Sequence, residues 1–102
     1  MIDHYDIDGN LITQHEWGEL FSDKTYARIA LTDLGDDVHV STVWLGIDHG
    51  FGAGPPLIFE TMIFGGPRNE DTERYTTKEQ ALAGHNRIVA ELARSTRGGR
   101  RS

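Results

Sequence analysis

The strongest restriction on the fold comes from residues 42–66, TVWLGIDHGFGAGPPLIFETMIFGG, where two apolar runs flank a loop rich in glycine and proline. The loop contains Gly46, Gly50, Gly52, Gly54, Pro55 and Pro56. Because such residues form turns and interrupt regular secondary structure, the apolar runs are predicted to be two strands joined by this loop. Apolar walls with a few polar groups are also typical of a small-molecule or ion site. The polar residues in question are Asp48, His49 and Glu60.

The strand expected at 38–47 carries apolar residues on both of its faces. Successive side chains of a strand point to opposite faces, so Val40, Thr42 and Trp44 share one face and Ser41 and Val43 share the other. This pattern favours a central strand that is covered on each side. A further strand is expected at 57–64, apolar except for Glu60 and Thr61.

The remaining elements are predicted from caps and helical spacing. Thr13 and Glu16 form a capping-box pattern before a short helix at 14–22, and residues 25–33 resemble a strand. Thr76 and Glu79 form a second such pattern before a helix that runs to about residue 94. We therefore expect a single α+β domain at 1–94, with a three- to four-stranded antiparallel sheet, one long C-terminal helix packed on it and a short N-terminal helix. The basic end, 95–102, is expected to be a disordered tail.

Composition excludes several classes of function. The chain of 102 residues contains no cysteine, which rules out a thiolate metal ligand or nucleophile. The formal net charge of −6 argues against general nucleic-acid binding, since phosphate contacts are made by lysine and arginine. No apolar run approaches the roughly 20 residues of a membrane helix, and the first residues lack the order of a signal peptide. We expect a cytoplasmic protein.

His85 is the most unusual polar residue, because it falls on the apolar stripe of the C-terminal helix. It is interpreted either as a hydrogen-bonded structural histidine or as a site residue that meets Asp48, His49 or Glu60. His49, Glu60 and His85 would suit a divalent metal, and His85 with Glu60 could act as general acid and base. Glu60 is alternatively interpreted as a residue on a solvated face of the sheet, with no role in a site. No phosphate-binding loop or serine-nucleophile motif is present.

The segments VSTVWLGIDHGFGAGPPLIFETMIFGG (40–66) and RYTTKEQALAGH (74–85), with YDIDGNLI and EWGELF near the start, resemble a group of small uncharacterised bacteriophage and prophage proteins, especially of actinobacteria. The resemblance implies a phage-borne accessory protein that acts in the bacterial cytoplasm. It assigns no catalytic role to any residue.

The sequence leaves two functions open. The favoured hypothesis is a non-enzymatic module that binds a host protein or small ligand through the sheet and the loop, using Trp44, Asp48, His49 and Phe51. The alternative is a small metal-dependent or acid–base enzyme that uses Asp48, His49, Glu60 and His85. The strand edge at 25–33 also suggests a homodimer formed by sheet pairing.

Overall fold

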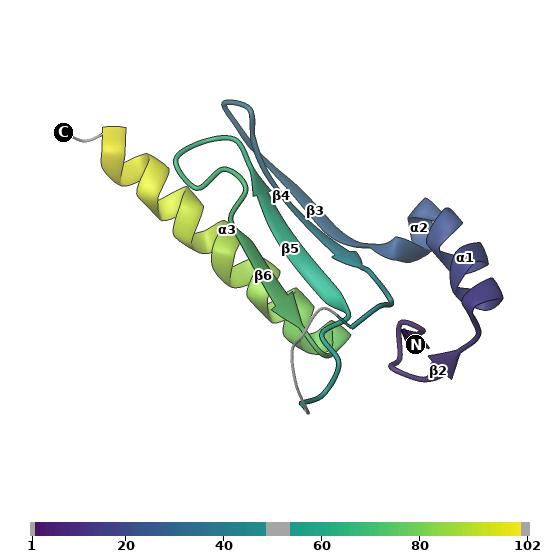
Figure 1. Cartoon of the computed structure of the whole chain (residues 1–102). Helices are drawn as coiled ribbons and strands as arrows, with labels where there is room; N and C mark the ends of the chain where they lie inside the picture. Colours follow the sequence, from purple (N-terminus) through teal and green to yellow (C-terminus); the bar gives the residue numbers. More distant parts are fainter. Residues whose placement is uncertain (1, 49–53, 101–102) are drawn as a thin grey trace.

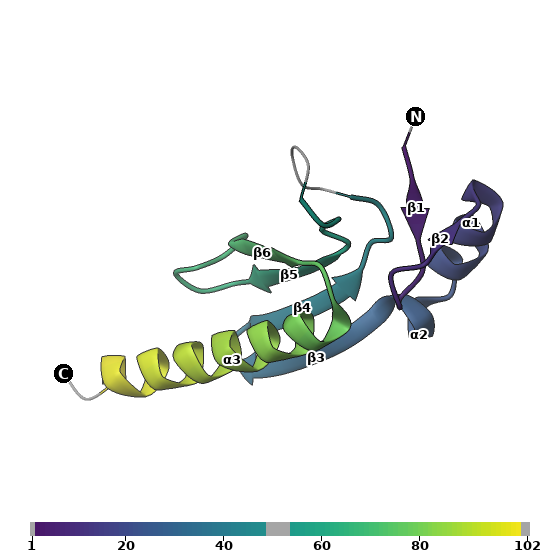
Figure 2. The ribbon, with the colours of Figure 1, turned by 90° about the horizontal axis from the view of Figure 1, so that it is seen from below.

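The computed structural model describes residues 2–48 and 54–100 and confirms the expected α+β class. The described residues form a four-stranded antiparallel sheet in the order β3-β4-β5-β6 and a two-stranded sheet, β1-β2. One long helix, α3, lies along the larger sheet, and the N-terminal elements gather at one end of it (Figures 1 and 2).

The N-terminal unit contains β1 (His4–Tyr5), β2 (Leu11–Ile12), α1 (Gln14–Ser22) and α2 (Lys24–Ala27). The predicted capping box of α1 is confirmed, because the Glu16 backbone N–H donates to Thr13 Oγ1 (3.1 Å) and the Thr13 N–H donates to the Glu16 carboxylate (2.9 Å). The expected strand at 25–33 begins later than predicted. Asp23 accepts hydrogen bonds from the backbone of Thr25 and Tyr26, and this cap starts α2 where the strand was expected.

The larger sheet contains β3 (Arg28–Gly35), β4 (Val38–Trp44), β5 (Phe59–Phe64) and β6 (Thr72–Tyr75). Thr42 of β4 pairs with Ala30 of β3 and with Thr61 of β5. The strand β6 was not predicted, since its sequence, TERY, is mostly polar and follows directly on a polar loop.

Helix α3 spans Lys78–Arg100. Its cap lies one residue later than predicted: the Gln80 N–H donates to Thr77 Oγ1 (3.1 Å), and the Thr77 N–H donates to Gln80 Oε1 (3.3 Å). The helix also continues past the expected end at residue 94, so the backbone at 95–100 is helical where a disordered tail was expected. None of the helices in the two described ranges has the length and apolar character needed to cross a membrane.

The core lies on one face of the larger sheet, beneath α3 and, around Trp44, beneath side chains of the N-terminal unit. Helix α3 contacts all four strands. The fully buried side chains on this covered face include Val40, Trp44, Phe59 and Ile63. On the opposite face, the described residues of β4 and β5 are half-buried or exposed. Strand β4 is central in the sheet, as expected, because it pairs with β3 and β5. The expectation that both of its faces are covered near its end is wrong, because only one face is buried.

Candidate functional site

His85 lies in the core between α3 and the sheet. Its side chain is only 2% exposed. Its Nδ1 is 2.8 Å from Thr42 Oγ1 on β4, and its Nε2 is 2.9 Å from Thr32 Oγ1 on β3. Both ring nitrogens therefore have a hydroxyl partner, as expected of a structural histidine.

The hydrogen bonds of His85 continue through the sheet to β6. Thr42 Oγ1 is 2.5 Å from Thr61 Oγ1, and the Tyr75 hydroxyl donates to Thr61 Oγ1 at 3.1 Å. Among the described residues, no buried side-chain nitrogen or oxygen lacks a hydrogen-bond partner. We call His85, Thr32, Thr42, Thr61 and Tyr75 the hydroxyl network. At its end, the Tyr75 hydroxyl also interacts with the carboxylate of Glu73, which forms an ion pair with Arg87 on α3. The five members of the network form a satisfied polar layer within an apolar core.

The protonation state of His85 follows from its surroundings. Burial lowers the pKa of His85 below its usual value, because the charged imidazolium loses its hydration. A neutral imidazole has one donor and one acceptor nitrogen. His85 therefore donates to one of Thr32 and Thr42 and accepts from the other, and each threonine hydroxyl can serve in either role.

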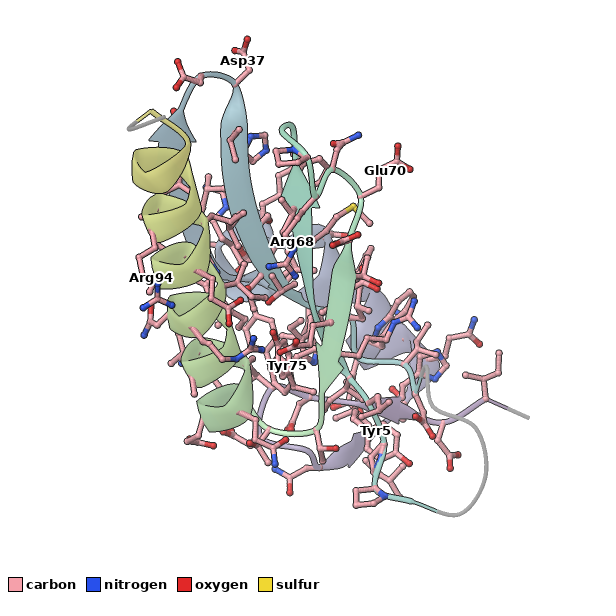
Figure 3. The ribbon with its side chains drawn as sticks, turned by 90° about the vertical axis from the view of Figure 1, so that its left-hand side faces the viewer. Tyr5, Asp37, Arg68, Glu70, Tyr75 and Arg94 are labelled. Atoms are coloured by element: carbon pink, nitrogen blue, oxygen red, sulfur yellow. The ribbon has the colours of Figure 1, made fainter. Side chains whose placement is uncertain are left out.

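Close approach of α3 to β6 depends on Gly84. A Cβ atom at this position would overlap the ring and hydroxyl of Tyr75. Tyr75 lies between β6 and α3 (Figure 3). The expectation that a glycine beside the apolar stripe allows close packing on the sheet is confirmed.

Glu60 lies on the opposite face of the sheet from His85. It is the cross-strand partner of Arg74, and the Arg74 Nε is 2.9 Å from the Glu60 carboxylate. Its neighbour Thr61 is the residue that points into the core. The structure therefore does not bring Glu60 and His85 together, and neither an acid–base pair nor a shared metal site forms between them.

The other predicted site residues belong to the loop or to the core. Asp48 Oδ1 accepts a hydrogen bond from the Leu57 N–H at 2.8 Å, which ties the two sides of the Gly/Pro loop together. Trp44 is fully buried and donates its indole N–H to the Tyr5 carbonyl at 3.1 Å, which leaves its ring out of reach of a ligand. His49 and Phe51 lie outside the described residues. Within 2–48 and 54–100, no group of three or more histidine or acidic side chains is arranged to hold a metal ion.

A pocket of about 280 Å³ lies between the N-terminal unit and the start of α3. Pro56 from the Gly/Pro loop lines it, together with Asp8, Lys78 and Glu79. Its charged residues are of both signs, and His85 and Glu60 are not among its lining residues.

The uncovered face of the larger sheet is the surface that sequence reasoning missed. We call it the open face, and we define it by the register of the four strands. Its residues are Arg28, Leu31 and Asp33 on β3, His39, Ser41 and Val43 on β4, Glu60, Met62 and Phe64 on β5, and Thr72 and Arg74 on β6.

Apolar groups of the open face are accessible. Leu31 is 50% exposed and Phe64 is 37% exposed. The His39 ring stacks on Phe64, with ring centroids 4.7 Å apart and an interplanar angle of 15°. The alternation of His39, Ser41 and Val43 along β4 was the available signal, but it does not tell which face a helix covers.

Comparison with protein-family models, with curated proteins and with solved structures found no match to this chain.

Proposed function

We propose that this protein is a non-enzymatic binding module whose binding surface is the open face of the larger sheet. The supporting observation is the asymmetry of the sheet: α3 covers one face, while the other presents Leu31, Met62 and Phe64 among polar side chains. Charged residues, Arg28, Asp33, Glu60 and Arg74, stand at its margins. Accessible apolar groups with a polar rim are typical of protein interfaces.

The dimensions of this face suit transient binding of a protein. With strands about 4.8 Å apart and a rise of about 3.3 Å per residue, four strands of about six residues present roughly 380 Å². A patch of this size is often functional on a monomer, and it falls in the range of small, transient interfaces. A flat sheet offers a small molecule little enclosure, so the geometry favours a protein partner over a small ligand.

The partner that we propose is a bacterial host protein, met in the cytoplasm by an accessory protein of bacteriophage type. The resemblance of residues 40–66 and 74–85 to phage proteins supports this choice. The enzymatic alternative has less support, because His85 is enclosed in the core and Glu60 pairs with Arg74 on the other face.

Site-specific photo-crosslinking in bacterial cells tests the proposal. A photoreactive phenylalanine analogue replaces Phe64 on the open face or, as a matched control, Phe21 on α1, which is 45% exposed. We expect one discrete covalent adduct from position 64 and none from position 21. No adduct from position 64, or the same adducts from both positions, would refute the assignment.

Binding of the captured protein then gives a quantitative check. Met62→Ser on the open face should weaken binding by about tenfold, the effect of removing a central apolar contact. Leu11→Ser, at a residue 67% exposed on β2, should leave binding unchanged. Equal losses in both variants would contradict an interface on the sheet.

A further inference from the structure

Strand β3 forms an edge of the larger sheet. It pairs with β4 on one side, and none of the described strands pairs with its other side. An edge strand presents a row of unpaired backbone N–H and C=O groups, and proteins often protect such edges with proline, charged side chains or bulges. Strand β3, RIALTDLG, has no proline, and its two charged side chains, Arg28 and Asp33, are of opposite sign. Its register irregularities lie toward its two ends, so residues 30–33 are regular. This edge can therefore accept another strand.

The side chains of β3 place opposite charges on the two sides of Leu31. Leu31 lies on the open face, half exposed, with Arg28 on one side and Asp33 on the other. Arg28 and Asp33 form no ion pair with the described residues. The Asp33 carboxylate accepts only a local hydrogen bond, from the Gly35 N–H at 2.9 Å.

We propose that β3 pairs antiparallel with β3 of a second copy of this chain, about a two-fold axis at Leu31. In this register the two Leu31 side chains face each other and bury the exposed leucine. In this register, Asp33 of one copy faces Ile29 of the other. The irregularity between Arg28 and Ala30 keeps the neighbouring Arg28 on the open face, close to that Asp33. Two Arg28–Asp33 ion pairs then flank the leucine pair, one on each side.

Neighbouring registers lack this match. Antiparallel partners must point to the same face, so the axis can move only to Ala30 or to Thr32. An axis at Thr32 places Leu31 opposite Asp33, which buries a carboxylate against an apolar group. An axis at Ala30 places Leu31 opposite the irregularity at Arg28 and Ile29, where it has no leucine partner, and it places Asp33 opposite the end of α2, before β3 begins. Charge complementarity and burial of Leu31 therefore select the axis at Leu31.

The resulting assembly is a closed dimer. A two-fold pairing uses each β3 edge once, so it forms no open chain. The contact is small, and we expect the dimer to dissociate in the micromolar to millimolar range. The dimer has one continuous sheet of eight strands.

Sedimentation of the full chain from about 10 μM to about 1 mM tests the proposal. We expect a concentration-dependent monomer–dimer equilibrium. Arg28→Glu should weaken it by about tenfold, because attraction becomes repulsion at two symmetric contacts. Arg28→Glu combined with Asp33→Lys should restore it. Lys24→Glu, the same charge change at an exposed position of α2, should have no effect.

Several outcomes would overturn the pairing. These are a wild-type protein that stays monomeric up to 1 mM, a dimer that resists Arg28→Glu and Leu31→Asp, or a double variant that is folded but not restored. Circular dichroism of each variant establishes that it is folded. In amide exchange by NMR, we also expect alternate β3 amides to gain protection as concentration rises, and unchanged exchange would contradict strand pairing. A monomeric protein that still cross-links from Phe64 would overturn self-pairing and leave the proposed function intact.

Discussion

Removing the imidazole of His85 should destabilise the fold strongly, because the ring fills the space between α3 and the sheet. In His85→Ala, a side chain that is 2% exposed is lost. Cavities left by larger aromatic rings cost about 3–5 kcal/mol, so the smaller imidazole should cost about 2–3 kcal/mol. The two lost hydrogen bonds add about 1 kcal/mol each. Thr42 retains Thr61 as a partner, and half-buried Thr32 can reach water, so neither hydroxyl adds a full desolvation penalty.

The sum, about 4–5 kcal/mol, is a large part of the 5–15 kcal/mol expected for the whole domain. At about 4–8 °C per kcal/mol, the melting temperature should fall by roughly 15–40 °C. Urea unfolding followed by circular dichroism gives the free energy directly. His39→Ala on the open face is the matched control, and we expect it to cost less than about 1 kcal/mol, because this ring is only half-buried and stacks on Phe64.

His85→Gln and His85→Asn divide the loss of stability between the two ring nitrogens. The amide of glutamine reaches the position of Nε2 and can keep the bond to Thr32, whereas the amide of asparagine reaches the position of Nδ1 and can keep the bond to Thr42. Each should recover about half of the loss. If His85→Ala costs less than about 1 kcal/mol, the hydroxyl network does not hold α3 on the sheet, and the structural interpretation of His85 fails.

Two more predictions follow from the same packing. The pKa of His85 is lowered in the folded state, so its contribution to stability is present above the unfolded pKa of about 6.5 and is lost as the pH falls below it. The difference in unfolding free energy between wild type and His85→Gln should therefore shrink between pH 7.5 and 5. A constant or growing difference in urea titrations would refute this prediction. Gly84→Ala should destabilise by about 1–3 kcal/mol, because the new Cβ overlaps Tyr75, whereas Gly18→Ala, with open space around it on α1, should stabilise by up to about 1 kcal/mol. Thermal unfolding of both variants checks the opposite signs.

Local signals in the sequence predicted the elements well where the decisive contacts are themselves local. The capping box of Thr13 and Glu16 joins residues three apart, so its pattern can be found without the fold. The cap of α3 was displaced by one residue because Thr76 and Thr77 are both followed three positions later by a suitable partner. Strand β6 was missed because it is short, lies at the sheet edge and has mostly polar side chains.

The candidate site was less predictable because it depends on which face of the sheet α3 covers. The sequence of β4 offers apolar residues on both faces, and either could have received the helix. Once α3 lies over Thr42, the pairing of Thr42 with Thr61 sends Glu60 to the other side. The expectation that His85 faces the sheet is confirmed. Glu60, one of its expected partners, lies on the opposite face of the sheet.

The hydroxyl network has a consequence for how α3 finds its place. Thr32, Thr42 and Thr61 come from three adjacent strands, and each is an ordinary strand residue in the sequence. If α3 slid by one helical turn, His85 would face apolar side chains, and its two nitrogens and the threonine hydroxyls would lose partners. Each buried group left unsatisfied costs about 1–3 kcal/mol. An apolar residue at position 85 would carry no such penalty and would tolerate the shifted packing. The network therefore stabilises one position of α3 over its neighbours, and this explains a histidine on the apolar stripe without a catalytic role.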